Sequence, residues 1–333
     1  MHYMKLFKAL VPKLLIVARY VLLAAVIGFA VYYLAIQWSG VTKALDTISW
    51  LSLVVSFVMV LLGLAAGTLS WVSILNGLGP KVAVPRASQV MLVGQLGKYV
   101  PGSVWAYVMQ MELGRQYGIL RPRVLVTALY AAGIGVVSSL ILGAFALPVL
   151  VYGNTQLLWL FLLLPIGLAC LHPAIMTWLA SLMLRIFRRP PLDHRVTFSV
   201  IGRAVGWSLA SYVFYGLHLW ILVDSLVEPD FATLVLLTGA VAMGFTVGLF
   251  AFIFPSGVGV REAVLIGAMS LLLTVAQGTA ISLVSRILFT TADVLAAGIA
   301  VLFVIVLRRR LKAETVSQYA DVEIDHDRNT SSP

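Results

Sequence analysis

A short segment of the sequence, residues 95–105, combines a charged side chain with residues that interrupt a helix. Its helix-breaking residues are Gly97, Pro101 and Gly102. Ser103 can cap a helix that restarts there, and the free N–H groups of such a helix end bind anions. Lys98 adds a full positive charge beside them. The segment therefore predicts an anion site, and the alternative is an interfacial turn whose lysine reaches the lipid headgroups.

A second segment, residues 254–262, repeats this combination. Its helix-breaking residues are Pro255, Gly257 and Gly259. We expect a helix to begin at about Val260 and to expose the positive end of its dipole. Arg261 offers a planar fork that matches a phosphate group, and Glu262 can pair with this arginine or with another. Broken helices in both halves of a membrane protein indicate a transport site. The alternative is an ordinary cytoplasmic turn between two helices.

The third segment is a long apolar run that contains both Arg286 and Asp293. These residues are seven positions apart, so they lie on one face of a helix, two turns from each other. Charges within a membrane are costly, which makes both residues functional candidates. Arg286 could pair with Glu262 or receive a phosphate, and the alternative is a structural ion pair that locks two helices. His218 is either a proton relay or, as is commoner for a lone helical histidine, a hydrogen-bonded packing residue.

The composition indicates the class of protein that must position these residues. The chain has 333 residues, of which 61% are hydrophobic and 11% charged, whereas ordinary soluble domains carry about 25% charged residues. A water-soluble enzyme is therefore excluded. The net charge of +10 comes from small basic clusters between apolar runs, a pattern typical of cytoplasmic membrane loops and not of nucleic-acid binding. The single cysteine, Cys170, excludes a disulfide framework, and we expect no metal site.

Helix-length apolar runs predict an all-α integral membrane protein. Each run is long enough to cross the roughly 30 Å hydrocarbon core of a bilayer. The runs are residues 14–36, 50–75, 124–151, 156–184, 204–226, 231–254 and 279–307. Residues 87–111 and 255–276 are less continuous, and we expect broken helices near 97–103 and 255–260. Irregular backbone at membrane depth is tolerated only where protein or a polar cavity surrounds it. The G-x-x-x-G pattern from Gly63 to Gly67 predicts close helix packing.

The distribution of charge sets the predicted topology. With the N-terminus inside, nearly all basic loop residues fall on the cytoplasmic side, and only Lys43 falls outside. This balance requires residues 87–111 to enter and leave on the cytoplasmic side. The prediction is about eight crossings plus one re-entrant hairpin, in the cytoplasmic membrane, with both termini cytoplasmic. Residues 1–312 form the membrane domain, and residues 313–333 a short disordered cytoplasmic tail.

Enzyme classes fit the sequence poorly. Ser256 and His218 have no spacing that supports an intramembrane serine protease. A glycosyltransferase would need carboxylates in an outer loop, and the first such loop offers only Asp46. The sequence also lacks a phosphate-binding loop for ATP. We therefore expect a protein that is not an enzyme and that needs no cofactor.

The three segments resemble the landmarks of the lysylphosphatidylglycerol synthase transmembrane-region family, also called flippase-like. The matching stretches are Gly97–Trp105, Pro255–Ala263 and Ser285-Arg286 with the following Ile-Leu. The second, P-x-G-x-G-x-R-E, is the most specific, and the resemblance spans roughly residues 14–310. In bifunctional members this region moves an aminoacylated phospholipid made by a fused synthase domain, and this chain resembles a stand-alone member. The first stretch is similar to a variant found near glycan assembly, which implies a polyprenyl-phosphate-linked sugar as cargo. Asp293 matches no part of the family pattern.

Our leading prediction is a flippase-like transporter that moves an anionic lipid headgroup across the cytoplasmic membrane. The cargo is a polyprenyl-phosphate-linked sugar or a phospholipid. The predicted substrate-binding residues are Lys98, Ser103, Arg261, Glu262, Arg286 and Asp293. The two carboxylates among them would orient or neutralise the arginines. The expected partners are the lipid-linked substrate, membrane lipids and a glycosyltransferase or lipid synthase. The alternatives are a non-transporting scaffold of such a synthase and, more distantly, an integral-membrane glycosyltransferase.

Overall fold

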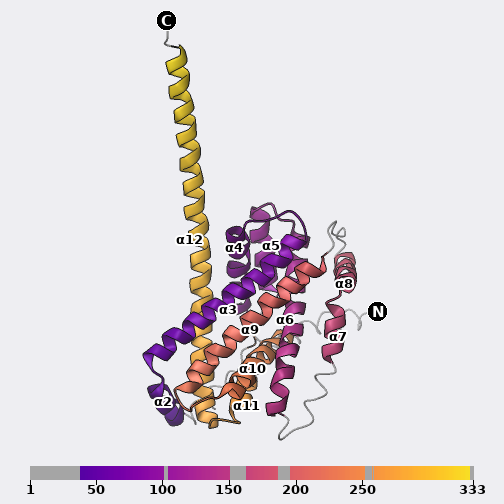
Figure 1. Cartoon of the computed structure of the whole chain (residues 1–333), viewed down its shortest axis with the longest axis vertical. Helices are drawn as coiled ribbons and strands as arrows, with labels where there is room; N and C mark the ends of the chain where they lie inside the picture. The colour runs from indigo at the N-terminus through magenta and orange to yellow at the C-terminus, as the bar shows by residue number, and fades with distance from the viewer. Residues whose placement is uncertain are drawn as a thin grey trace, which may run out of the picture.

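The computed structural model describes residues 38–100, 104–150, 163–186, 196–251, 257 and 259–330, and this part of the chain contains helices and no strand (Figure 1). Its elements in chain order are α2 (Trp38–Thr47), α3 (Trp50–Gly77), α4 (Val84–Gln95), the 3-10 helix η1 (Leu96–Tyr99), α5 (Trp105–Gln116), α6 (Arg121–Leu150), α7 (Leu163–Cys170), α8 (Pro173–Ile186), α9 (Phe198–Asp224), α10 (Phe231–Phe250), α11 (Val260–Met269) and α12 (Val275–Thr330).

Five helices of the described residues are long and apolar enough to cross a membrane. They are Trp50–Gly77, Arg121–Ala146, Phe198–Asp224, Phe231–Phe250 and Val275–Leu307. The prediction of an all-α, multi-pass membrane protein is confirmed at this level. The count of about eight crossings stays a prediction, because the run 14–36 and part of the run 156–184 lie outside the described residues.

The helices α3 and α9 pack antiparallel along most of their length, from the contact of Ser56 with His218 to that of Gly77 with Val200. Small residues let the two backbones approach each other, since Gly63 faces the ring of Tyr215 and Gly67 faces Ser211. The hydroxyl of Ser211 donates to the carbonyl of Gly63 at 2.8 Å, which ties the helices at this crossing. The prediction that the G-x-x-x-G pattern packs helices is therefore confirmed.

The segment predicted to be interrupted, residues 87–111, forms an antiparallel hairpin of two short helices. Gly94 of α4 packs against Gln110 of α5, and a side chain on Gly97 would lie 2.7 Å from the backbone nitrogen of Ala106. A residue larger than glycine would therefore push η1 away from α5. The break that the sequence predicted near 97–103 is present, and Pro101, Gly102 and Ser103 lie outside the described residues.

Both ends of this hairpin lie at the same end of the bundle. Arg123, at the start of α6, donates hydrogen bonds of 2.7 Å to the carbonyls of Leu75 and Pro80 at the end of α3. The exposed Glu112 of α5 pairs with Arg121 at 2.5 Å and with Arg115 at 2.7 Å. Hydrogen bonds from Arg121 and then Arg115 hold the pKa of Glu112 below its usual value. The chain thus leaves α3 and enters α6 on one side of the molecule.

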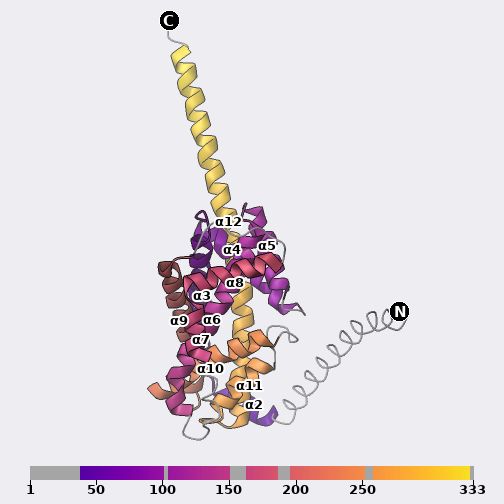
Figure 2. The ribbon, with the colours of Figure 1, turned by 90° about the vertical axis from the view of Figure 1, so that its right-hand side faces the viewer.

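The second predicted break separates α10 from α11. The helix α11 begins at Val260, as the sequence predicted, and runs back along α10, because Gly248 lies next to Gly257 and Gly244 next to Val264. It has 10 residues, or about 15 Å of helix, which is half of a bilayer core. Pro255 lies outside the described residues. The helix α12 then begins at Val275 and extends past α4 and α5 (Figures 1 and 2).

The connections at the two ends of the bundle differ in charge. The end that holds α4 and α5 carries basic residues, which include Lys81, Arg86, Arg115, Arg121, Arg123 and Arg203. The opposite end holds α2 and the α9–α10 connection, where Leu226 packs against Val41 and Ala44. The ionisable residues there are Lys43, Asp46, Asp224, Glu228 and Asp230. Within the described part of the chain, the connections that the charge pattern assigned to the cytoplasmic side therefore lie at one end of the bundle.

One element differs from the predicted ones. The described part of the run 156–184 is two helices, α7 and α8, with a break at Leu171 and His172. The prediction of one continuous helix was wrong because Pro173 lacks an N–H group and begins a new helix. The helix α12 extends as far as Thr330, and the disordered tail predicted for residues 313–333 stays a prediction.

Candidate functional site

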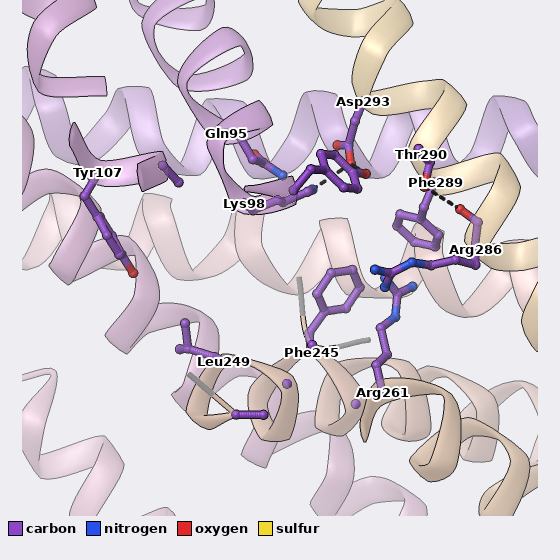
Figure 3. A pocket seen from close by; sticks show the side chains of 16 residues that line it. Gln95, Lys98, Tyr107, Phe245, Leu249, Arg261, Arg286, Phe289, Thr290 and Asp293 are labelled. Atoms are coloured by element: carbon purple, nitrogen blue, oxygen red, sulfur yellow. Dashed lines mark hydrogen bonds and ion pairs between the residues drawn. The ribbon is translucent and has the colours of Figure 1, made fainter. Parts of the chain in front are cut away.

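A cavity of about 240 Å³ opens where the α4–α5 hairpin meets α10, α11 and α12 (Figure 3). The sequence had predicted site residues in three separate segments, and the structure brings them to this one cavity. Its lining includes Lys98, Tyr99, Tyr107, Arg261, Arg286 and Asp293. Glu262 forms an ion pair with Arg286. Ser103 lies outside the described residues.

Arg261 is the most enclosed cation of the cavity. Only 6% of its surface is exposed, and its guanidinium carbon lies 4.0 Å from the ring centroid of Phe245 and 4.1 Å from that of Phe289. Such cation–π contacts contribute about 2 kcal/mol or more where water is excluded. The Nη2 atom is buried without a hydrogen-bond partner among the described residues. A buried donor of this kind is costly unless a ligand accepts from it.

The backbone before α11 holds Arg261 in this position. Gly257 has a φ of 64°, and a Cβ atom there would lie 2.9 Å from the Cα atom of Gly248. Gly259, the N-cap of α11, has a φ of 85°. Both values belong to the left-handed region that L side chains avoid. The glycines therefore permit a tight return of the chain, which starts α11 against α10 and directs Arg261 into the cavity.

Glu262 has two roles, one for each carboxylate oxygen. Its Oε2 atom accepts the backbone N–H of Gly259 at 2.7 Å and so caps α11. Its Oε1 atom lies 3.3 Å from Nη1 of Arg286 on α12. The pairing of these two residues, one of the outcomes expected from the sequence, is present. Figure 3 shows the guanidinium groups of Arg261 and Arg286 pointing toward one another, so a single anion could contact both.

Asp293 joins the hairpin to the last helix. Its Oδ2 atom lies 2.6 Å from Nζ of Lys98, and it accepts a hydrogen bond of 2.5 Å from the hydroxyl of Tyr99. The sequence assigned Asp293 to the arginines, but its direct partners come from η1. The seven-residue spacing explains the difference, because it separates Asp293 from Arg286 by about 10 Å along the helix. One residue therefore faces η1 while the other faces α11.

His218 is a buried packing residue beside the cavity and does not line it. Its Nδ1 atom lies 2.5 Å from the hydroxyl of Ser56, and its Nε2 atom lies 2.9 Å from that of Ser285. The ring stands edge-on to Phe289, with the centroids 5.4 Å apart. The expectation of a hydrogen-bonded packing histidine is confirmed. Both ring nitrogens are engaged by serines, and Phe289 is held between this histidine and Arg261.

Aromatic residues are the part of the site that the sequence reasoning missed. Tyr99 follows Lys98 inside the first segment, so its position offered a signal. Phe289 follows Arg286 by three residues and shares its helix face, which is a weaker signal. Phe245 lies in a uniformly apolar helix far from any charged residue in the sequence. Nothing in the local sequence separates it from ordinary lipid-facing or core phenylalanines.

The comparison with protein families agrees with this arrangement. The model of the family described as "Lysylphosphatidylglycerol synthase TM region" matches residues 16–298. The chain belongs to this family. The matched region of the lysylphosphatidylglycerol synthase TM region family includes all three segments and every charged residue of the cavity, so the resemblance inferred from the motifs is confirmed. No protein with a curated description matches the chain.

Proposed function

We propose that the protein is a transporter that moves an anionic lipid headgroup across the cytoplasmic membrane without covalent chemistry. The observation that carries the proposal is Arg261, a buried guanidinium in a membrane-protein cavity whose Nη2 atom has no hydrogen-bond partner among the described residues. A group of this kind suits a phosphate, because the planar fork matches two of its oxygens. The cargo is a polyprenyl-phosphate-linked sugar or a phospholipid.

The arrangement of the broken helices supports this role. The hairpin α4–α5 and the half-length helix α11 meet at the cavity and place polar backbone and side chains at depth. Irregular backbone in a membrane is stable only where it lines such a polar space. We propose that the hairpin is re-entrant and that the end with the basic connections faces the cytoplasm. In this orientation both termini are cytoplasmic.

A phosphate can bind Arg261 without breaking either ion pair of the site. Lys98 is balanced by Asp293, and Arg286 by Glu262. A phosphate entering beside Arg261 gains a charge-assisted bond worth about 1.5–3 kcal/mol. The cations beside it add attraction without leaving a carboxylate unpaired. In this role the partners are the substrate, the surrounding lipids and a glycosyltransferase or lipid synthase that supplies the cargo.

The test is translocation of labelled lipid in vesicles that contain the purified protein. Arg261→Ala and Arg286→Ala should abolish transport while the protein remains folded, and Arg261→Lys should restore little because lysine lacks the fork. Arg203→Ala, at an exposed position of α9, is the matched control and should transport at the wild-type rate. A non-transporting scaffold would move no lipid in any form. Normal transport by a stable Arg261→Ala protein would exclude this site as the path of the phosphate.

A further inference from the structure

We infer that the cavity selects a headgroup with one negative charge, a single phosphodiester, over lipids linked through a diphosphate. The inference rests on the proposed function and specifies its substrate class. It depends on two observations made on the structure itself. The first is the net charge of the side chains at the site, and the second is the set of groups that surround Arg261.

The charges that the described residues bring to the site add to +1. Three cations are present, Lys98, Arg261 and Arg286, against two carboxylates, Asp293 and Glu262, which gives 3 − 2 = +1. Two of the cations lie in direct ion pairs, and Arg261 has no carboxylate at ion-pair distance among the described residues. The undescribed residues beside the two breaks, 101–103, 252–256 and 258, carry no ionisable side chain. They therefore cannot alter this balance.

A net charge of +1 on side chains that are largely out of water favours a ligand charge of −1. Burying an uncompensated charge away from water costs free energy, whether the charge is positive or negative. A phosphodiester makes the occupied site neutral. A diphosphate that bridges a lipid and a sugar carries two negative charges and would leave the site with an excess of one. A phosphomonoester carries about −1.5 to −2 at pH 7 and is disfavoured for the same reason.

The surroundings of Arg261 also limit how many phosphates it can hold. The ring centroids of Phe245 and Phe289 lie 4.0 Å and 4.1 Å from the guanidinium carbon and 5.6 Å from each other, so the two rings occupy adjoining sides of the guanidinium. The Nη2 atom, which has no hydrogen-bond partner among the described residues, belongs to an edge that can bind two oxygens of one phosphate. A second phosphate would have to draw Lys98 or Arg286 away from its carboxylate. The cavity of about 240 Å³ is also small compared with typical ligand sites of about 300–1,000 Å³.

The experiment is a binding competition with the purified full chain in nanodiscs. The three probes are a polyprenyl-phosphate-linked hexose, the same hexose and polyprenyl chain joined by a diphosphate, and phosphatidylglycerol. We expect the Kd of the diphosphate probe to be at least about tenfold higher than that of the phosphodiester with the same chain, a difference of about 1.4 kcal/mol. The phosphatidylglycerol probe tells a polyprenyl source of the phosphodiester from a glycerolipid source. Equal or tighter binding of the diphosphate probe would overturn the inference.

A charge variant should weaken or remove the selection. Asp293→Asn raises the site charge to +2 by freeing Lys98, so the ratio of the two Kd values should shift by about tenfold toward the diphosphate probe. Glu262→Gln makes the same change of charge at another position and replaces the first variant if that one does not fold. Asp230→Asn, in the N-cap of α10 at the far end of the bundle, is the matched control and should leave the ratio unchanged. A ratio that both site variants leave unchanged would also overturn the inference.

The outcomes separate this inference from the proposed function. Wild-type protein that transports lipid but binds both polyprenyl probes equally would refute the charge selection alone. Protein that prefers the phosphodiester but moves no lipid would refute the transporter role alone. Protein that binds none of the three probes would refute both.

Discussion

The Nζ atom of Lys98 lies 2.6 Å from the Oδ2 atom of Asp293, which joins the first broken segment directly to the last membrane-length helix. Asp293 is 4% exposed and Lys98 is 24% exposed. The hydroxyl of Tyr99 donates to the same carboxylate oxygen. The position of the α4–α5 hairpin against α12, and with it one wall of the cavity, therefore depends on a charge pair that is largely out of water.

The first prediction concerns the stability that this pair provides. Lys98→Met should lower the free energy of unfolding by about 3–5 kcal/mol, because it leaves the buried carboxylate of Asp293 without its counter-charge. The double variant Lys98→Met with Asp293→Leu should recover most of that loss, since no buried charge remains. Denaturant unfolding in detergent micelles measures both. The exposed pair of Arg115 and Glu112 serves as the control, and its removal should have little effect. Equal losses in the single and double variants would show that the charge pairing is not the cause.

The second prediction concerns the turn before α11. Gly257→Ala should destabilise the protein by roughly 1–2 kcal/mol from its left-handed backbone alone, and the contact with Gly248 adds to this. Because the turn directs Arg261 into the cavity, lipid transport should fall as well. Gly267→Ala is the matched control on α11, where an added Cβ meets nothing within 4 Å and improves helix propensity. Thermal stability in detergent that is the same for both variants would contradict the role of this turn.

Much of the site could be predicted from local sequence features. The second segment predicted a helix start at about Val260, and α11 begins there because glycines permit the turn and Glu262 caps the helix. The pairing of Glu262 with Arg286 was one of the outcomes that we considered, since buried charges need partners. The packing role of Gly63 and Gly67 also followed from a local pattern. These features depend on interactions over a few residues or on a strong physical requirement.

The remaining features depend on contacts between distant segments. The pairing of Lys98 with Asp293 exists because the hairpin folds back against α12, which no local pattern specifies. The rings of Phe245 and Phe289 enclose Arg261 only after α10, α11 and α12 have packed together. The break between α7 and α8 is different, because Pro173 was visible in the sequence and the apolar composition of the run concealed its effect.

The third prediction concerns His218, which positions Phe289. His218→Ala should destabilise the protein by about 1–3 kcal/mol, because the hydroxyls of Ser56 and Ser285 lose their shared partner. Transport should fall less than in Arg261→Ala, since the histidine touches the ring of Phe289 and not the cavity. The pH profile of transport by the stable variant should match that of the wild type. A pH profile that changes with this substitution would instead indicate a proton relay.

The fourth prediction concerns the sidedness of the hairpin. Residues 87–111 should enter and leave on the cytoplasmic side, because both ends of the hairpin lie where α3 ends and α6 begins. After Cys170 is replaced by serine, a cysteine at Gln116 should react with a membrane-impermeant reagent only from the cytoplasmic face. A cysteine at Glu228, in the connection between α9 and α10 at the opposite end of the bundle, is the matched control and should react only from outside. A cysteine at position 116 that reacts from the outer face, while the control at Glu228 also reacts from outside, would contradict the re-entrant hairpin.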